Sequence, residues 1–506
     1  MTKNKLEESS QKFVEGVDTT YATAQQIERV AVIGSGVMGA GIAAHCANAG
    51  CEVLLFDIIP KGNQRVQDRD VLAKGAVANI LNSNPEMLMH KSYAKRIITG
   101  NIEDDLSRLK EFDWVIEVII ENLEIKKDLY EKLAENLGTN TILSSNTSTL
   151  PRFALTHGMP HDIASRFLIT HFFNPPRYLP LLEVVAGPEV DESVVSRFAD
   201  FAEIKLGKHV THCNDTPGFI GNRLGVYFVQ RAIAATLDHE FTVEQADAML
   251  GRPIGLPKTA VFGLIDLVGV DLIPHIMESM LAHLNPDDPF HQIAGAGEQI
   301  IHSMIGEGYT GRKGKGGFYR LNRDGATKIK EARNLVTGEY APANRKVAFQ
   351  STKMAKQGLA RMLNHHDEGA AFVSDILVDT LAYAAYLVPE VTDDIFAIDN
   401  AMKVGYNWKR GPFEMMDELG SAELVSLLEA SNKPIPPFLT RAAESGPFYR
   451  LEDGEIYRLT PSGEYIEIDR PAETLTVADL KRRGKPLQRN ASASIWDADD
   501  GVLLIE

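Results

Sequence analysis

Short apolar runs alternate with helical stretches over roughly the first two hundred residues. Residues 28–57 pass from a buried-looking run through a glycine turn into a stretch of small residues, and then into a second run that ends at Asp57. This order predicts a β-α-β unit. Further apolar runs lie at 114–120, 141–143, 167–173 and 181–185. Strands that alternate with helices predict a mainly parallel sheet with helices on both faces.

The pattern changes to long helical stretches from about residue 215. The segment 246–269 then recurs in looser form at 398–420. Three matched pairs stand 151 residues apart: Phe262 and Phe413, Asp266 and Asp417, Gly269 and Gly420. This spacing predicts duplication of one helical domain, with the two copies stacked, rather than a short-period repeat.

The C-terminal sixty residues read differently from the helical part. Residues 451–489 mix short strand-like pieces with charges and prolines, which is typical of a linker or small appendage. The segment "SIWDADDGVLLIE" predicts two strands around an Asp-Gly turn. The expected divisions are an extension (1–27), a sheet domain (28–214), two helical domains (215–330 and 345–450), a linker (451–489) and a terminal segment (490–506).

Composition restricts the possible partners. The 44% of apolar and 24% of charged residues are typical of a soluble globular protein, and no apolar run is long enough to span a membrane. The polar, acid-containing N-terminus is unlike a secretory or transit signal, so we expect a cytoplasmic protein. The net charge of −17 argues against a nucleic-acid partner. Cys46, Cys51 and Cys213 are too scattered for a disulfide framework or a zinc site, and no metal is expected.

Gly34, Gly36 and Gly39 form a G-x-G-x-x-G motif between the first strand and its helix. The first glycine permits a tight turn, the second admits a pyrophosphate, and the third lets helix and strand pack closely. Asp57, 18 residues further on, is expected to bind the ribose hydroxyls and to repel a 2′-phosphate. The motif therefore predicts NAD, with Val37 and Met38 in the same cofactor site; FAD would use the same fingerprint.

His171 ends one apolar run and Glu183 lies inside the next, twelve residues later. A return loop of that length can place the two side chains beside each other on neighbouring strands. A carboxylate that fixes the tautomer of a histidine suits it to take a hydroxyl proton while hydride leaves the same carbon. Spacing alone also allows a buried pair that serves only the fold.

Six motifs, taken together, closely resemble the L-3-hydroxyacyl-CoA dehydrogenase family over about residues 28–320. They are "GSGVMGAGIA", "SSNTSTL", "THFFNPP", "LLEVV", "DTPGFIGNR" and "GGFY", in that order. The resemblance implies an α/β Rossmann-like NAD-binding domain followed by two all-α dehydrogenase C-terminal domains. It implies NAD-dependent oxidation of L-3-hydroxyacyl-CoA to 3-oxoacyl-CoA in fatty-acid β-oxidation.

The resemblance also implies roles for single residues. His171 matches the catalytic base and Glu183 the carboxylate that orients it. Ser148 matches the hydroxyl that bonds the reacting oxygen of the substrate, and Asn222 the amide that helps position His171 and substrate.

The cofactor positions follow from the same resemblance. Glu121, Lys126 and Asn174 match positions that line the nicotinamide end of the cofactor site. Lys313 matches a basic residue near the cofactor, although Gly314 stands where family members usually have Thr or Ser, which weakens that assignment.

An acidic protein needs local cations to hold an anionic CoA ester. The basic residues that follow Asp57 are candidates for the CoA phosphates, although a run of charges is more often a solvated face. They are Lys61, Arg65, Arg69 and Lys74.

Two expectations concern assembly. Single-copy relatives resemble dimers built through the helical domain, so a second copy predicts a monomer with an internal pseudo-dimer, with a homodimer as the alternative. The tail "NASASIWDADDGVLLIE" resembles the opening strands of an enoyl-CoA hydratase (crotonase) domain. This predicts a fragment of a bifunctional protein that is fused to or associated with a hydratase and a thiolase.

Two rival functions stay open at this point. One is a dehydrogenase of the same fold that acts on a free hydroxy acid or sugar acid. The other is a noncatalytic scaffold for a β-oxidation complex, against which the intact His171, Glu183, Ser148 and Asn222 argue.

Overall fold

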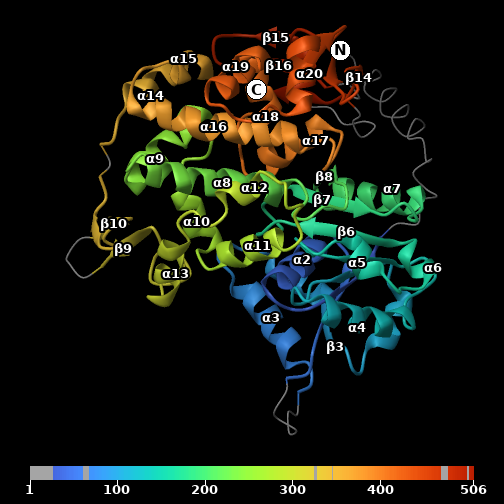
Figure 1. The fold of residues 1–506 in the computed structure, drawn as a ribbon. Helices are drawn as coiled ribbons and strands as arrows, with labels where there is room; N and C mark the ends of the chain where they lie inside the picture. The colour runs from blue at the N-terminus through green and yellow to red at the C-terminus, as the bar shows by residue number, and fades with distance from the viewer. Residues whose placement is uncertain (1–26, 61–67, 324–327, 345, 469–476, 499–500) are drawn as a thin grey trace. The chain divides into compact units, whose positions relative to one another are not determined.

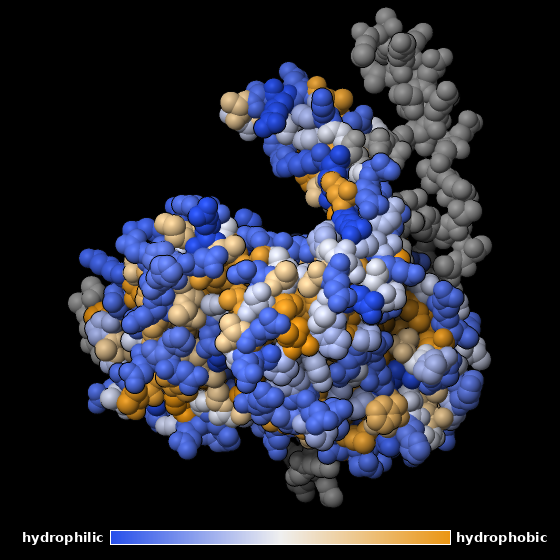
Figure 2. Space-filling model, turned by 45° about the horizontal axis from the view of Figure 1, so that its top comes forward, coloured by the Kyte–Doolittle hydropathy of each residue, from blue (hydrophilic) through white to orange (hydrophobic). Residues whose placement is uncertain are grey.

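The computed structural model describes residues 27–60, 68–323, 328–344, 346–468, 477–498 and 501–506. Contacts divide the chain into two compact units, Met1–Val210 and Thr211–Glu506 (Figure 1). Hydrophilic residues cover most of the face shown in Figure 2, and apolar residues form smaller patches between them. No helix among the described residues is long and apolar enough to cross a bilayer.

An eight-stranded sheet forms the centre of the first unit, in the order β3-β2-β1-β4-β5-β6-β7-β8. The strands from β3 to β6 in this order pair in parallel, whereas β7 runs antiparallel to β6. The prediction of a mainly parallel sheet is therefore confirmed. The strands are β1 (Arg29–Ile33), β2 (Glu52–Asp57), β3 (Ile97–Asn101), β4 (Trp114–Glu117), β5 (Ile142–Ser145), β6 (Phe167–Phe172), β7 (Leu181–Ala186) and β8 (His209–His212).

Helices cover this sheet and explain its apolar strands. Val30 and Val32 of β1 share one buried cluster with residues of α2 and α7, and the intervening Ala31 and Ile33 are equally buried. Both faces are covered, so the strands read as continuous apolar runs rather than as an alternation. The helices are α2 (Val37–Asn48), α3 (Val71–Asn82), α4 (Leu123–Ala134), α5 (Arg152–Thr156), α6 (His161–Ala164) and α7 (Glu192–Asp200).

The first half of the second unit is helical but ends in a small sheet. Its helices are α8 (Gly221–Asp238), α9 (Val243–Met249), α10 (Phe262–Val268), α11 (Leu272–Leu281), α12 (Phe290–Ile293) and α13 (Glu298–Gly306). Three antiparallel strands follow: β9 (Tyr319–Asn322), β10 (Ile329–Arg333) and β11 (Tyr340–Pro342).

The second half has the same order of helices and then strands. Its helices are α14 (Gln350–Met354), α15 (Leu359–Leu363), α16 (Glu368–Tyr386), α17 (Ile395–Asn400), α18 (Pro412–Leu419), α19 (Ser421–Ala430) and α20 (Pro437–Ser445). The strands are β12 (Tyr449–Glu452), β13 (Glu455–Leu459) and β14 (Tyr465–Glu467), again antiparallel.

These two sheets amend the expectation of two all-α domains. The strands of the first sheet extend to residue 342, past the expected end at 330. The second sheet lies largely inside the segment expected to be a linker. Both sheets are short and rich in charged residues, and a three-stranded sheet of that kind carries little hydrophobic periodicity to predict it from.

The two halves share a hydrogen-bond pattern that ties each helix bundle to its sheet. Asp266 of α10 accepts hydrogen bonds from the amides of residues 318–319, at 2.7 and 2.8 Å. Asp417 of α18 accepts the equivalent pair from residues 448–449, at 2.7 and 2.9 Å. Each aspartate thus fixes the start of the first strand of its sheet.

A second aspartate in each half also bonds to the first strand of the small sheet. Asp247 accepts a hydrogen bond from the hydroxyl of Tyr319, and Asp399 accepts one from the hydroxyl of Tyr449, both at 2.9 Å. Burial raises the pKa of Asp247 to about 7 and that of Asp399 to about 8. The matched acids therefore have matched environments in the two halves.

The long helices α8 and α16 pack against each other and join the two halves (Figure 1). The rings of Tyr227 and Tyr383 stack with centroids 3.9 Å apart. Arg223, which is fully buried, donates to the Tyr383 hydroxyl at 3.0 Å, to Asp288 at 2.5 Å and to Glu390 at 3.0 Å. Arg223 therefore bonds to both halves from the first turn of α8.

The C-terminal residues form a helix and a small sheet. They are α21 (Val477–Arg483), β15 (Gln488–Arg489), β16 (Ser494–Asp497) and β17 (Leu503–Ile505). Strands β16 and β17 pair antiparallel, which confirms the two predicted strands, and Asp500 of the predicted turn lies outside the described residues. Strand β15 pairs with the other edge of β16.

Candidate active site

Each glycine of the motif has its own steric reason. Gly34 has a φ of +107°, and a Cβ on it would fall on the carbonyl oxygen of Val118. A Cβ on Gly39 would fall on the carbonyl oxygen of Gly34, so α2 lies directly against the loop. A Cβ on Gly36 would meet open space. The second glycine therefore borders room for a ligand, while the first and third serve the backbone.

Asp57 lies at the end of β2 and contacts the glycine loop. Its Oδ2 accepts hydrogen bonds from the amide of Ser35 at 2.8 Å and from the Ser35 hydroxyl. Its Oδ1 accepts from the amide of Ile58 at 2.7 Å. The expected cofactor-binding acid thus also holds the loop that the cofactor would approach.

His171 and Glu183 lie next to each other on the adjacent strands β6 and β7. They are direct partners in the antiparallel register of β6 and β7, and the distance from Nδ1 to Oε2 is 2.7 Å. Glu183 is fully buried, and His171 is 6% exposed. An ionised carboxylate only accepts, so Nδ1 carries the proton of this bond and Nε2 is the ring nitrogen able to accept one.

Asn146, which sequence reasoning missed, braces the backbone next to His171. Its side-chain oxygen accepts a hydrogen bond from the amide of Phe172 at 2.9 Å. Its backbone N–H donates to the backbone carbonyl of Glu117 at 2.9 Å. Asn146 therefore links the ends of β4 and β6, and its place between Ser145 and Thr147 in "SSNTSTL" was the available signal.

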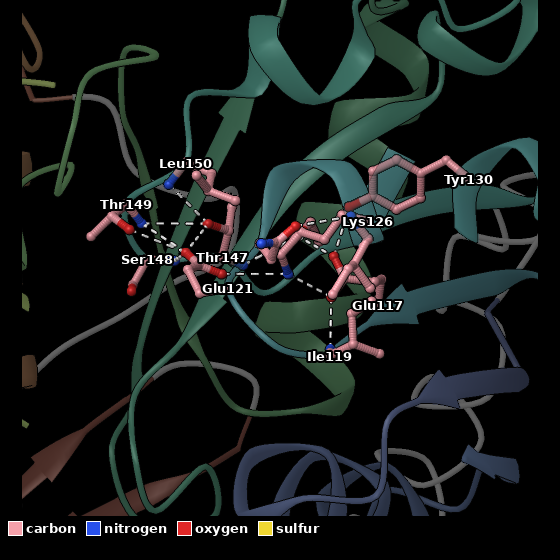
Figure 3. Close-up of polar contacts among 12 residues, drawn as sticks. Glu117, Ile119, Glu121, Lys126, Tyr130, Thr147, Ser148, Thr149 and Leu150 are labelled. Atoms are coloured by element: carbon pink, nitrogen blue, oxygen red, sulfur yellow. Dashed lines mark hydrogen bonds and ion pairs between the residues drawn. The ribbon is translucent and has the colours of Figure 1, made fainter. Parts of the chain in front are cut away.

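Glu121 organises the turn that carries Ser148 (Figure 3). Its Oε1 accepts from the amides of Ser148 and Thr149, at 3.2 and 3.3 Å, and from the hydroxyl of Thr147. Burial by itself would raise the pKa of Glu121, but the Lys126 ammonium and these hydrogen bonds hold it below its ordinary value. Glu121 therefore acts on the Ser148 turn as an anion.

Lys126 lies beneath this turn and bridges two carboxylates. Its side chain is 1% exposed, and its Nζ is 2.6 Å from Oε1 of Glu117 and 3.4 Å from Oε2 of Glu121. Its predicted contact with the cofactor stays a prediction, whereas its ion pairs are direct observations.

Glu117 is the centre of this buried network, and sequence reasoning did not find it. Besides the Lys126 ammonium, it accepts hydrogen bonds from the amide of Ile119 at 2.7 Å and from the Tyr130 hydroxyl at 2.6 Å (Figure 3). The Ser145 hydroxyl donates to it at 2.6 Å. Burial, together with this carboxylate, raises the pKa of Tyr130 well above its ordinary value. Glu117 is the last residue of an apolar strand, so the only available signal was a charge at a position that should be buried.

The parallel strands bring these first-unit residues to one edge of the sheet. The glycine loop follows β1, Asp57 ends β2, Glu121 follows β4, Ser148 follows β5 and His171 lies near the end of β6. The strand order reverses between β1 and β4, and ligands of such sheets bind at the carboxyl ends at that point.

The other predicted site residues have different settings. Asn174 is exposed, two residues after β6. Asn222 is nearly buried in the first turn of α8, and Lys313 pairs with Asp271 at 2.8 Å. Asn222 and Lys313 belong to the second unit, so the role of Asn222 beside His171 and that of Lys313 near the cofactor stay predictions.

The predicted CoA contacts are partly outside the described residues, as Lys61 and Arg65 are. Arg69 pairs with Asp104 at 2.6 Å, and Lys74 pairs with Asp68 at 2.6 Å. These exposed cations are thus engaged with acids of the same unit, and contact with CoA stays a prediction.

Comparison with known proteins identifies the family. Residues 29–216 match the profile of the 3-hydroxyacyl-CoA dehydrogenase NAD binding domain, and residues 218–321 match that of the C-terminal domain. A probable 3-hydroxyacyl-CoA dehydrogenase of Deinococcus radiodurans is 40% identical over 321 residues, which cover 63% of this chain and 89% of that protein. The chain belongs to the 3-hydroxyacyl-CoA dehydrogenase family. The predictions of this family and of NAD as the cofactor are confirmed.

Longer relatives in the family extend further along the chain. A probable 3-hydroxyacyl-CoA dehydrogenase of Bacillus subtilis is 34% identical over 500 residues, covering 95% of this chain and 62% of that protein. A putative fatty acid oxidation complex trifunctional enzyme of Rickettsia felis is 39% identical over 417 residues, covering 82% of this chain and 56% of that protein. The chain therefore spans a little over half the length of these two relatives.

A solved structure shares the fold over most of this chain. The 3-hydroxybutyryl-CoA dehydrogenase of Escherichia coli matches with a TM-score of 0.63 and 23% identity, covering 83% of this chain and 98% of that chain. This likeness concerns the fold.

Proposed function

We propose that this family member oxidises L-3-hydroxyacyl-CoA to 3-oxoacyl-CoA with NAD, using His171 as the base. The observation that carries the proposal is the bond of 2.7 Å between His171 and the fully buried Glu183. It lies at the sheet edge that also bears the glycine loop.

The proposed chemistry assigns one proton transfer to the protein. NAD, when bound, accepts the hydride that leaves C3 of the substrate. His171 takes the proton of the C3 hydroxyl at Nε2, and Glu183 stabilises the imidazolium through Nδ1. Because Glu183 sits on the neighbouring strand, the ring keeps one orientation as its charge changes.

The remaining site residues receive supporting roles in this proposal. The Ser148 hydroxyl bonds the reacting oxygen and is held in place by Glu121, which fixes its turn. Asn222 helps to position His171 and substrate. Lys126, Asn174 and Lys313 line the cofactor site. The CoA phosphates are met by the basic residues that follow β2: Lys61, Arg65, Arg69 and Lys74.

The test is the rate of NADH oxidation with acetoacetyl-CoA. His171→Ala is expected to lower kcat by roughly 10²–10⁴-fold while NAD still binds. His157→Ala is the matched control, because this exposed histidine lies in the same unit. An unchanged kcat in His171→Ala would contradict the assignment of the base, and equal activity on free acetoacetate would favour a dehydrogenase of free hydroxy acids.

We also propose that the two halves of the second unit are copies of one domain. The support is the repeated pattern of Asp266 and Asp417 toward the two small sheets, and of Asp247 and Asp399 toward a strand tyrosine. Packing of α8 on α16 would then replace a contact between subunits. The chain is expected to sediment as a monomer of 55.7 kDa, and twice that mass at low concentration would argue for a homodimer.

A hydratase and a thiolase are the proposed partners in β-oxidation. The support is the resemblance of the tail to a crotonase opening and the name of the trifunctional relative. Co-purification of enoyl-CoA hydratase and thiolase activities with the chain is the expected result, and their absence would count against these partners. A cytoplasmic location also stays a prediction.

A further inference from the structure

The second unit contains a cavity whose charge is opposite to that of the chain. Its volume is about 1620 Å³, and its walls come from residues between 244 and 347. Seven basic and three acidic side chains are among the described residues that line it. The whole chain carries a net charge of −17, so this concentration of cations is local.

The three acidic side chains of the wall are already engaged by hydrogen-bond donors. Asp266 accepts the amides of residues 318–319, and Asp247 accepts the amides of residues 261–263 and the hydroxyl of Tyr319. Glu244 accepts the amide of Asn344 at 2.9 Å. These carboxylates hold the wall together, and bonds from neutral donors leave their charges in place, so the seven cations outnumber the acids of the lining by four. One of the seven, Arg320, pairs with Glu331 at 2.7 Å.

A tight loop at residues 311–316 carries three basic residues, of which two line the cavity and one does not. The amide of Gly311 donates to the carbonyl of Gly316 at 2.8 Å, and the amide of Arg312 donates to the carbonyl of Asp266 at 2.8 Å. Lys313 pairs with Asp271, whereas its neighbours Arg312 and Lys315 line the cavity. These bonds fix the backbone of the loop, and the Lys315 ammonium also donates to the carbonyl of Glu307 at 3.0 Å.

Two further cations come from a separate segment. Arg252 begins the short helix η5 (Arg252–Ile254), and Lys258 lies in the turn after it; both are exposed and both line the cavity. Neither they nor Arg312 form an ion pair with an acid among the described residues. The lining holds four more basic than acidic side chains, so its cations repel one another on balance, and a bound anion would relieve that repulsion.

We propose that this cavity binds a small phosphorylated ligand of nucleotide size. Guanidinium and ammonium groups on two segments suit the oxygens of clustered phosphates. The volume exceeds what one phosphate fills, and the half-buried ring of Tyr309 adds aromatic surface to the wall. The acidic chain disfavours a long nucleic acid, because it would repel the phosphates beyond the cavity.

The test uses the full chain, adenosine 3′,5′-bisphosphate as the probe, and hydrogen exchange read by mass spectrometry. Peptides that cover residues 252–258 and 308–316 are expected to gain protection as the probe is added. In Arg252→Gln/Lys258→Gln the concentration needed for half-maximal protection should rise about tenfold or more. Lys356→Gln/Arg361→Gln, which removes two exposed cations outside the cavity, is the matched control and should titrate like the natural chain.

Each result decides the proposal. Arg252→Lys/Lys258→Arg should restore the titration, which separates charge from folding. No protection of either peptide, or the same titration in the Gln double variant, would overturn the site. Inorganic phosphate that protects as well as the nucleotide would overturn the nucleotide-sized ligand. If the natural chain shows protection of both peptides but does not reduce acetoacetyl-CoA, the result would count only against the dehydrogenase assignment.

Discussion

Lys126→Met tests whether the buried network beneath the Ser148 turn is coupled electrostatically. The substitution keeps most of the unbranched apolar stem and removes the ammonium, with its charge and its hydrogen bond to Glu117. Glu117 would then be a fully buried carboxylate without its cation, since Lys126 is 2.6 Å away and is itself 1% exposed. Removal of one partner of a buried ion pair typically costs several kcal/mol, because the other charge stays buried.

The structure sets the expected size of the effect. Glu117 would still accept from the amide of Ile119 and the hydroxyls of Tyr130 and Ser145. The expected loss of unfolding free energy is therefore about 3 kcal/mol, near the lower end for broken buried pairs. Glu117→Gln/Lys126→Met removes both charges and should cost about 2 kcal/mol less than the sum of the two single changes.

Hydrogen exchange of peptides from β4 and α4 gives the local unfolding free energy in the intact chain. Lys132→Met is the control, because Lys132 is exposed on the same helix. Equal protection in the Lys126 and Lys132 variants would refute the reasoning. Strict additivity in the double variant would show that the two charges do not interact.

Three further predictions concern the first unit. Asp57→Ala should weaken NAD binding about tenfold by titration calorimetry, because it removes the ribose partner and the brace of the glycine loop; unaltered affinity would remove both roles. Gly36→Ala should change the melting temperature little but weaken NAD binding, whereas Gly39→Ala should lower the melting temperature, since only its Cβ meets backbone; the reverse order would be inconsistent with the loop geometry. His45 is buried, and burial followed by the charge of Lys208 lowers its pKa to about 4. Below pH 6.5 the unfolded chain therefore binds a proton that the folded chain does not, and local stability should fall by about 3 kcal/mol toward pH 4. His45→Gln should remove that slope in hydrogen exchange of α2, and an unchanged slope would assign it to other groups.

Part of the fold and site could be predicted because the information is local. The glycine motif follows from steric needs within a few residues, and the conformations of Gly34 and Gly39 show those needs directly. Alternation of apolar runs with helical stretches predicted a parallel sheet, because side-chain periodicity reports which faces are buried. The twelve-residue spacing of His171 and Glu183 allowed neighbouring strands, and the antiparallel register makes them direct partners.

Short-range geometry encodes the glycine turn, the order of strands and helices, and the family motifs, and these features could be recognised from the amino-acid order. Tertiary structure alone decided that Glu117 gathers Lys126, Tyr130 and Ser145, and that Arg223 bonds to a tyrosine 160 residues away. The physical reason is that a buried charge is stable only beside its partners, and the spacing along a chain does not specify which distant donors will meet it. The two small sheets were missed for a related reason, because their strands are fixed by aspartates of preceding helices rather than by an apolar pattern of their own.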